Sequence, residues 1–457
     1  MEEALEAAIA HADEYLRDLP ARPVGWTATV EELRAALGGD LPDEPIPAVD
    51  VIAEMVKGID GGIVGTSSPR YFGFVIGGGL PVTIAADWLT TVWDQNHGLY
   101  AAGPGASVIE ETAGGWLKDL LGVPRQASFA LVTGCQMAHF VCLAAARHHI
   151  LRELDWDVET DGLQGAPRVT VVAGAERHVT IDRALRYLGL GTSSVREVAA
   201  DGQGRMDPGS LNEVLKGSEG PTIVCAQAGN VNTGSFDPLD EICDAAHAAG
   251  AWVHVDGAFG LWAAAAPSLR HLTAGSDKAD SWATDAHKWL NVPYDSGLAF
   301  CAHPEPHRAA LSVHADYLIQ SSDRRDPMDW TPEFSRRARS FAVYAALRSL
   351  GRSGVAEMIE RCCANARRFA EKLGSESGIH VLNEVVLNQV LVSFGSDART
   401  RAVVEAVQRD GTCWLSGSVW HGQGVMRISV SNWATTAEDV DLSVEAILRC
   451  AREVTEN

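Results

Sequence analysis

The middle of the chain alternates between short apolar runs and longer segments with helical periodicity. Apolar runs of this length are typical of buried strands, and they lie at residues 129–132, 168–173, 222–226, 251–255 and 280–284. Segments with apolar residues at helical spacing separate the first four runs and predict helices. Because strand and helix alternate from about residue 125 to 300, we expect an α/β fold with a mainly parallel central sheet and helices on both faces.

The two ends of the chain show different patterns. Residues 2–19 carry a single apolar stripe that ends at Pro20, and the proline-rich stretch beyond has one short helical piece near 30–37. A helix with one apolar face and no core of its own must pack on the main domain or on a second subunit. The C-terminal part alternates strands with amphipathic helices; we expect strands at 380–382, 389–393 and 425–430, and helices at 355–373, 398–409 and 437–449. We therefore divide the chain into an N-terminal helical arm (1–75), a large α/β domain (76–351) and a small α+β domain (352–457).

Polar and small residues follow the predicted strands. They are Gly134, Cys135 and Gln136 after the first run, His178 after the second, Gln227 after the third, Asp256 after the fourth and Lys288 after the fifth. In open α/β sheets, ligands bind at the edge where the carboxyl ends of the strands meet. The glycine turn at Gly134 precedes a predicted helix, and a helix N-terminus presents backbone N–H groups to an anion such as a cofactor phosphate.

Asp256 and Lys288 together indicate a specific cofactor. Pyridoxal 5'-phosphate (PLP) needs a lysine amine to hold it as a Schiff base and a carboxylate beside its ring nitrogen to keep that nitrogen protonated. Taken alone, Asp256 could be a strand-end turn residue and Lys288 a solvated lysine. Their occurrence at two strand exits that should share one edge favours the PLP interpretation.

The amino-acid composition indicates which classes of partner the protein is suited to and in which compartment it is found. The chain has 37 basic and 60 acidic residues, a net charge of −23, which disfavours nucleic acid and anionic membranes as partners. The nine cysteines show no CxxC motif and no disulfide-scaffold spacing, as in a reducing compartment. The N-terminus lacks the composition of a signal peptide, and no apolar stretch approaches the roughly 20 residues that span a bilayer. We expect a cytoplasmic protein without a metal site, in which His139, His148 and His149 are ordinary helix residues.

Motifs along nearly the whole chain resemble the group II PLP-dependent amino acid decarboxylases. This family includes the aromatic amino acid, histidine and glutamate decarboxylases and belongs to fold type I, the aspartate aminotransferase superfamily. The motifs are ADEYLRDLPARPV, SPRYFGF, GPGASVIEE, CLAAAR, HVTIDRALRYLGLG, HVDGAFG, DAHKWLN and RISVSNWATTAEDVD. The resemblance implies a PLP-dependent carboxy-lyase that acts on an amino acid, and a homodimer with the arm wrapped across the partner.

The resemblance also implies roles for individual residues. Lys288 would form the Schiff base, Asp256 would contact the pyridine nitrogen, and Tyr317 would reprotonate Cα after CO₂ leaves. The other implied cofactor contacts are Ala258 below the ring, His178 above it, His287 near the phosphate, and Gly134, Cys135, Gln136, Gln227 and Asp285. An aromatic substrate is favoured because Tyr71, Phe72, Phe74 and Trp93 could wall the pocket.

The chain departs from the family pattern in ways that bear on substrate. Cys135 and Gln136 stand in a turn where many relatives have small residues, Gln227 replaces a usual threonine, and Asp285 replaces a common asparagine. Other possibilities therefore stay open: an aminotransferase, a decarboxylation-coupled aldehyde synthase, decarboxylation of an acidic amino acid, or a non-catalytic homologue. In the family, phenylalanine in place of the loop tyrosine accompanies aldehyde formation, so Tyr317 favours plain decarboxylation.

Overall fold

The computed structural model describes residues 2–313 and 324–454 of the chain. It divides into two units. The large unit comprises residues 77–366 with 383–389, and the small unit comprises residues 1–76, 367–382 and 390–457. The three domains expected from the sequence follow a different division and stay a prediction.

A seven-stranded sheet forms the centre of the large unit, with the strand order β1-β7-β6-β5-β4-β2-β3. The strands are β1 (Ser128–Val132), β2 (Thr170–Gly174), β3 (Val195–Val198), β4 (Thr222–Gln227), β5 (Trp252–Asp256), β6 (Ser281–Asp285) and β7 (Gly297–Cys301). The pairs from β3 to β6 are parallel, and β7 runs antiparallel to both β1 and β6. The predicted mainly parallel sheet is confirmed.

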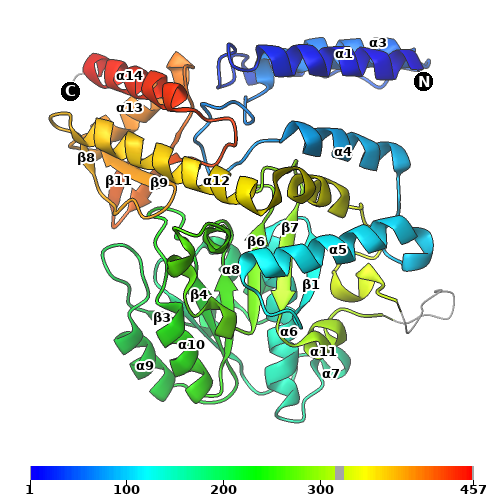
Figure 1. Cartoon of the computed structure of the whole chain (residues 1–457), viewed down its shortest axis with the longest axis vertical. Coiled ribbons are helices and arrows are strands. Elements are labelled where there is room, and N and C mark those ends of the chain that lie inside the picture. The colour runs from blue at the N-terminus through cyan, green and yellow to red at the C-terminus, as the bar shows by residue number, and fades with distance from the viewer. Residues whose placement is uncertain (1, 314–323, 455–457) are drawn as a thin grey trace. The chain divides into compact units, whose positions relative to one another are not determined.

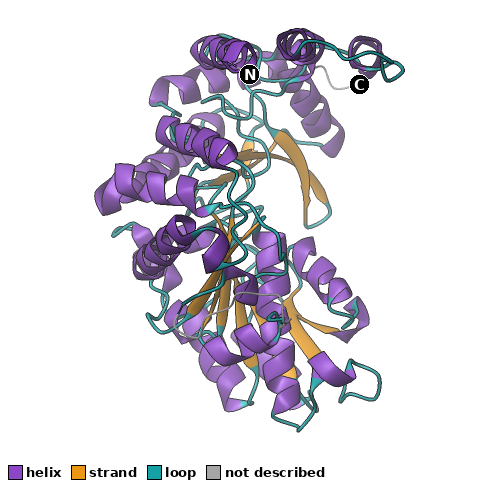
Figure 2. Ribbon diagram, turned by 90° about the vertical axis from the view of Figure 1, so that its right-hand side faces the viewer, coloured by secondary structure: helices purple, strands orange, loops and turns teal. Residues whose placement is uncertain are grey.

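Helices lie on both sides of this sheet (Figures 1 and 2). The helices of the large unit are α4 (Pro81–Trp93), α5 (Pro104–Leu121), α6 (Cys135–Arg152), α7 (Val158–Asp161), α8 (Val179–Tyr187), α9 (Pro208–Lys216), α10 (Leu239–Ala248), α11 (Pro304–Ala309) and the start of α12 (Ser340–Gly374). Every residue of β1, β4, β5 and β6 is buried. This double coverage explains why these strands read as continuous apolar runs.

The small unit contains a four-stranded sheet with the order β10-β11-β9-β8. Its strands are β8 (His380–Val381), β9 (Gln389–Ser393), β10 (Ser416–Trp420) and β11 (Gln423–Ser429), and its helices are α1 (Glu2–Asp18), α2 (Val30–Leu37), α3 (Ala48–Ile59), α13 (Asp397–Asp410) and α14 (Ala437–Glu453). The N-terminal segment joins the C-terminal one through Tyr71, whose ring stacks on Trp414 with centroids 5.1 Å apart. The predicted α+β character of the C-terminal part is confirmed.

Several elements were not predicted from the sequence, among them β3, β7, β10 and α3. Strand β3 lies at the edge of its sheet and exposes two of its four side chains, so it lacks a continuous apolar run. Strand β7 is short and follows an irregular turn. Helix α3 begins directly after Pro47 in a stretch that we expected to be extended, because proline is well tolerated at the start of a helix.

A buried ion-pair network ties α5 to the segment before α12. The Glu110 carboxylate lies 2.7 Å from Arg325 and 3.0 Å from Arg336, measured to the guanidinium nitrogens. Burial alone would raise the pKa of Glu110, but the two guanidinium groups outweigh it and lower the pKa to about 2. Because folding lowers the pKa of Glu110, the ionised carboxylate stabilises the folded protein at pH values above the ordinary glutamate pKa, near 4.3. This stabilisation is lost as the pH falls through about 2.

Glu110→Gln is expected to lower the free energy of unfolding by about 3–5 kcal/mol, because it leaves two guanidinium groups without their buried counter-charge. Urea unfolding followed by circular dichroism measures the change. Glu111→Gln, at the exposed neighbouring position, is the matched control and should change stability by no more than about 0.5 kcal/mol. Equal effects of the two substitutions would contradict a stabilising role of the network.

Candidate active site

The carboxyl ends of adjacent strands bring the predicted polar residues to one edge of the large sheet. Gln227 at the end of β4 pairs in register with Asp256 at the end of β5. Asp285 ends β6, and Gly297 at the start of antiparallel β7 pairs with it. The same Gly297 is so close to Gly134 that a Cβ atom there would lie 2.4 Å from the Gly134 backbone. The structure therefore joins the glycine turn after β1 to the ends of β4, β5 and β6.

Lys288 is bound within its own turn by Asp285. Its Nζ lies 2.8 Å from Asp285 Oδ2, while Asp285 Oδ1 accepts a hydrogen bond of 2.6 Å from the backbone N–H of Cys135. Burial would lower the pKa of Lys288, but the Asp285 carboxylate is the main counteracting charge and the pKa is raised above its ordinary value. Asp285 thus connects the lysine with the N-terminus of α6.

His287 completes this side of the site. Its Nδ1 accepts a hydrogen bond of 3.0 Å from the Ser296 backbone N–H, and its Nε2 lies 3.4 Å from Asp285 Oδ1. Burial lowers the pKa of His287, which favours the neutral ring. The Tyr294 ring stacks on it, with centroids 4.2 Å apart.

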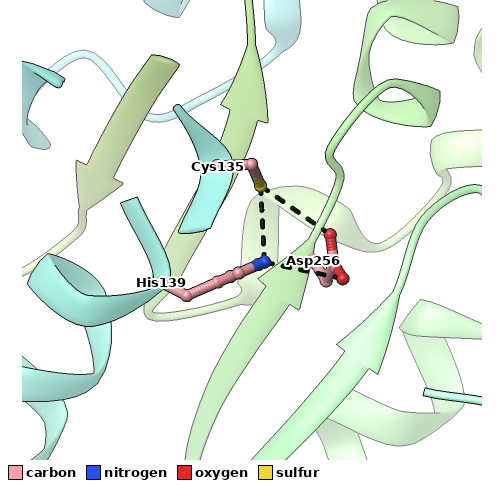
Figure 3. Close-up of side chains that lie close together, drawn as sticks. All are labelled: Cys135, His139 and Asp256. Carbon is pink, nitrogen blue, oxygen red and sulfur yellow. Dashed lines mark hydrogen bonds and ion pairs between the residues drawn. The ribbon is translucent and has the colours of Figure 1, made fainter. Parts of the chain in front are cut away.

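Asp256 lies in a buried cluster with Cys135 and His139 (Figure 3). The Cys135 Sγ is 3.9 Å from Asp256 Oδ1, and the His139 Nε2 is 3.6 Å from Asp256 Oδ2 and 3.4 Å from Cys135 Sγ. The backbone N–H of Ala258 donates to Asp256 Oδ1 at 3.1 Å. Thiol, imidazole and carboxylate are all metal-ligand types, so the expectation of no metal site stays a prediction.

The remaining predicted residues take these places. His178 is the N-cap of α8, half-buried, with its Nδ1 2.7 Å from Thr180 Oγ1. The Gln227 side chain is buried, and its Oε1 accepts a hydrogen bond of 3.0 Å from Asn230. Tyr317 lies outside the described residues.

Some buried polar atoms near Lys288 are suited to a polar ligand. Among the described residues, both amide atoms of Gln136 and the hydroxyls of Thr284 and Ser296 are buried without a hydrogen-bond partner in the protein. Buried polar atoms of this kind usually have partners. Gln136 is in the first turn of α6, where a helix favours an anion. A lysine amine, a carboxylate and these unpaired groups fit a phosphorylated aldehyde cofactor.

A family model described as the pyridoxal-dependent decarboxylase conserved domain matches residues 31–395. The chain belongs to this family. Among curated relatives, an aromatic-L-amino-acid decarboxylase of Bacillus atrophaeus is 25% identical, with 96% of this chain and 93% of the relative covered. The acidic amino acid decarboxylase GADL1 of Bos taurus is 29% identical, with 78% of this chain and 68% of the relative covered.

Solved structures show the same fold. The structure of Oryza sativa TDC with PLP and tryptamine matches with a TM-score of 0.92 at 22% identity, covering 99% of this chain and 97% of that one. Mouse CSAD matches with a TM-score of 0.91 at 22% identity, covering 99% and 98%. As a member of the pyridoxal-dependent decarboxylase family, this chain is a PLP-dependent amino acid decarboxylase of fold type I, and the predicted family, fold, cofactor and reaction class are confirmed.

Sequence reasoning missed two histidines in this decarboxylase. His139 contacts Asp256, although we expected an ordinary helix residue, and its Nδ1 lies 2.9 Å from Nε2 of His254. A signal for His139 was available: it follows Cys135 by four residues on one helix, and residues at that spacing share a face. His148 and His149 have other neighbours, Glu159 and Trp252 respectively.

Proposed function

We propose that Lys288 holds PLP covalently and that Asp256 pairs with its ring nitrogen, in a decarboxylase for an L-amino acid with an aromatic side chain. The observation that carries this proposal is the convergence of the two residues at the ends of neighbouring strands β5 and β6. When bound, the cofactor withdraws electrons from Cα of the substrate, so that the bond to the carboxylate can break.

Asp285 is the ion-pair partner that orients the Lys288 amine. Its Oδ2 lies 2.8 Å from Lys288 Nζ and fixes the position from which this amine would hold the cofactor aldehyde. His287 Nε2, 3.4 Å from Asp285 Oδ1, stabilises the negative charge of that carboxylate.

The other residues would hold the cofactor. Gln136, with its unpaired amide, and the backbone at Gly134 and Cys135 would bind the phosphate together with His287. His178 would cover one face of the ring and Ala258 the other, with Gln227 at the edge. Support for these roles comes from their places at strand exits and helix starts around Lys288 and Asp256.

An aromatic substrate is supported by the relatives. Curated relatives include tryptophan and tyrosine decarboxylases, at 25% and 24% identity. The acidic side chain of a substrate would need an arginine to pair with. Two of the arginines have other partners: Arg325 forms an ion pair with Glu110, and Arg337 forms one with Asp87 at 2.9 Å. The acidic amino acid decarboxylases among the relatives keep the acidic substrate as the second candidate.

The homodimer and the cytoplasmic location are also proposals. Helices α1 and α3 pack together yet leave large apolar side chains exposed, namely Leu5, Ile9, Leu16, Val51, Met55 and Ile59. A second subunit would cover this surface, and sedimentation of a single-chain mass would contradict the dimer. Within the described ranges, no helix has both the length and the apolar character needed to cross a bilayer.

A product assay over the twenty amino acids, with added PLP, tests the function. We expect CO₂ and the corresponding amine, with an aromatic amino acid as the best substrate. We propose that Tyr317 supplies the proton to Cα, so Tyr317→Phe should replace most of the amine by aldehyde and ammonia, with dissolved O₂ as the two-electron oxidant and hydrogen peroxide as its product. A phenylacetaldehyde synthase among the relatives, at 24% identity, makes this alternative product relevant.

Release of a keto acid instead of CO₂ would contradict decarboxylation by the wild-type chain. Best turnover of aspartate or glutamate would favour the acidic substrate. An unchanged ratio of amine to aldehyde in Tyr317→Phe would contradict the role given to Tyr317 alone.

A further inference from the structure

A row of buried polar side chains leads from Asp256 into the core of the large unit. His139 on α6 is next to Asp256, His254 on β5 follows, and Ser281 on β6 comes third; all three are completely buried. The His139 Nδ1 is 2.9 Å from His254 Nε2, and the His254 Nδ1 is 3.0 Å from Ser281 Oγ. The indole N–H of Trp252 donates to the same Ser281 Oγ at 2.9 Å.

Both imidazoles in the row are neutral at physiological pH. Burial lowers the pKa of His139 to about 3 and that of His254 to about 3. A neutral imidazole carries one N–H and one acceptor nitrogen. The contact between the two rings therefore has one donor and one acceptor, and the choice of tautomer in one ring sets the tautomer in the other.

The negative charge of Asp256 determines which nitrogen of each imidazole donates a hydrogen bond and which accepts one. His139 Nε2 lies 3.6 Å from Asp256 Oδ2, so a lone pair on that nitrogen would face a carboxylate in a dry environment. An N–H there is attracted instead, which makes His139 Nδ1 the acceptor. His254 then donates from Nε2, and its Nδ1 accepts from the Ser281 hydroxyl.

We propose that His139 is a positioning residue that, with His254 and Ser281 behind it, holds the Asp256 carboxylate oriented for the cofactor ring nitrogen. This inference rests on the proposed role of Asp256. The two oxygens of Asp256 have different neighbours. The Ala258 N–H donates to Oδ1 at 3.1 Å, and His139 Nε2 lies 3.6 Å from Oδ2; Figure 3 shows the approach of His139 to Asp256. Dipoles that are aimed at a charged group and fixed by hydrogen bonds behind them favour its charged form.

Ser281, His254 and His139 each orient the next side chain in the row by a hydrogen bond or a close contact. Ser281 receives the Trp252 indole N–H and directs its own hydroxyl to His254. His254 orients the His139 ring through the 2.9 Å contact between them, and the His139 ring also lies 3.4 Å from Cys135 Sγ and 3.6 Å from Asp256 Oδ2. Loss of the His139 ring therefore removes the only side-chain N–H group in this row that faces Asp256.

The tautomers are measurable directly. In the PLP-bound enzyme with ¹⁵N-labelled histidine, His139 and His254 should both give the Nε2–H pattern, with assignment by loss of the signals in single variants. A proton on Nδ1 of His139 would overturn the inference, since the lone pair of Nε2 would then face the carboxylate.

The effect on the cofactor is measured with two variants and a control. His139→Leu should weaken PLP binding about 10- to 100-fold, the usual effect of removing a supporting partner behind a binding group. With PLP labelled at its ring nitrogen, the ¹⁵N signal should shift toward the unprotonated form. His139→Gln keeps an N–H donor at a similar reach and should restore most of the affinity and the protonated signal.

Val141→Ala, a buried apolar change on the same helix, is the control for loss of packing and should leave the ring-nitrogen signal unchanged. If His139→Leu binds PLP as tightly as wild type with the same ¹⁵N signal, the inference fails while the role of Asp256 stands. If the Asp256→Asn variant gives the same ring-nitrogen ¹⁵N signal as wild type, the proposed role of Asp256 itself is contradicted. The two failures are thus distinguishable.

Discussion

Replacing Lys288 with alanine is expected to remove the visible absorbance of the bound cofactor and to reduce decarboxylation below detection. The reason is chemical: the described site offers one amine at the junction of β6, the glycine turn and Asp256, and that amine is Lys288 Nζ, 2.8 Å from Asp285. Without it, PLP is held by noncovalent contacts alone and lacks its point of attachment. Absorbance spectra and CO₂ release measure the result.

Two matched variants distinguish the loss of cofactor attachment from the loss of a positive charge and from the loss of any lysine. Lys288→Arg keeps the positive charge beside Asp285 but cannot hold the aldehyde, so it should be as inactive as alanine. Lys278→Ala removes a surface lysine that bridges Asp240 and Asp244 and should retain activity. Substantial turnover by Lys288→Ala or Lys288→Arg would contradict the assignment.

Asp256→Asn is expected to lower kcat by about 10²–10³-fold, the size of effect found when one preorganised electrostatic partner of a reacting group is removed. The amide keeps the shape of the carboxylate and can still accept from the Ala258 N–H. It lacks the negative charge that, in the proposed function, holds a proton on the ring nitrogen. Steady-state kinetics with PLP in excess check the change, and KM should change less than kcat.

Asp280→Asn controls for the loss of a partly buried acid elsewhere on the same sheet. Asp280 precedes β6, at the opposite end from Asp285, and lies 3.0 Å from His247 and 2.9 Å from His303. This substitution should affect stability more than kcat. A kcat loss in Asp256→Asn no larger than in Asp280→Asn would contradict the special role of Asp256.

The sequence was sufficient to predict which edge of the sheet brings Asp256, Asp285 and Gly134 together. Asp256 and Asp285 stand directly at the ends of buried strands, and in a parallel sheet the strand ends share one edge whatever the details of packing. The same logic placed the glycine turn at Gly134. The family motifs then added the cofactor, which the lysine and acid had already suggested.

Contacts between side chains from different elements could not be predicted from the sequence. That Asp285, three residues before Lys288, is the nearest carboxylate to the amine depends on the turn that follows β6. The approach of His139 to Asp256 depends on how α6 packs against β5 and β6. Strand β3 was missed because an edge strand with exposed side chains has no apolar run to detect.

Covalent attachment of the cofactor to Lys288 is the central claim, and reduction of the PLP-bound enzyme with borohydride tests it most directly. Reduction fixes the cofactor to whichever amine holds it, and peptide mass spectrometry then locates the added pyridoxyl group. We predict that the modified peptide is the one containing Asp285 to Trp289, with the added mass on Lys288. Modification of a different lysine, or of none, would contradict the account.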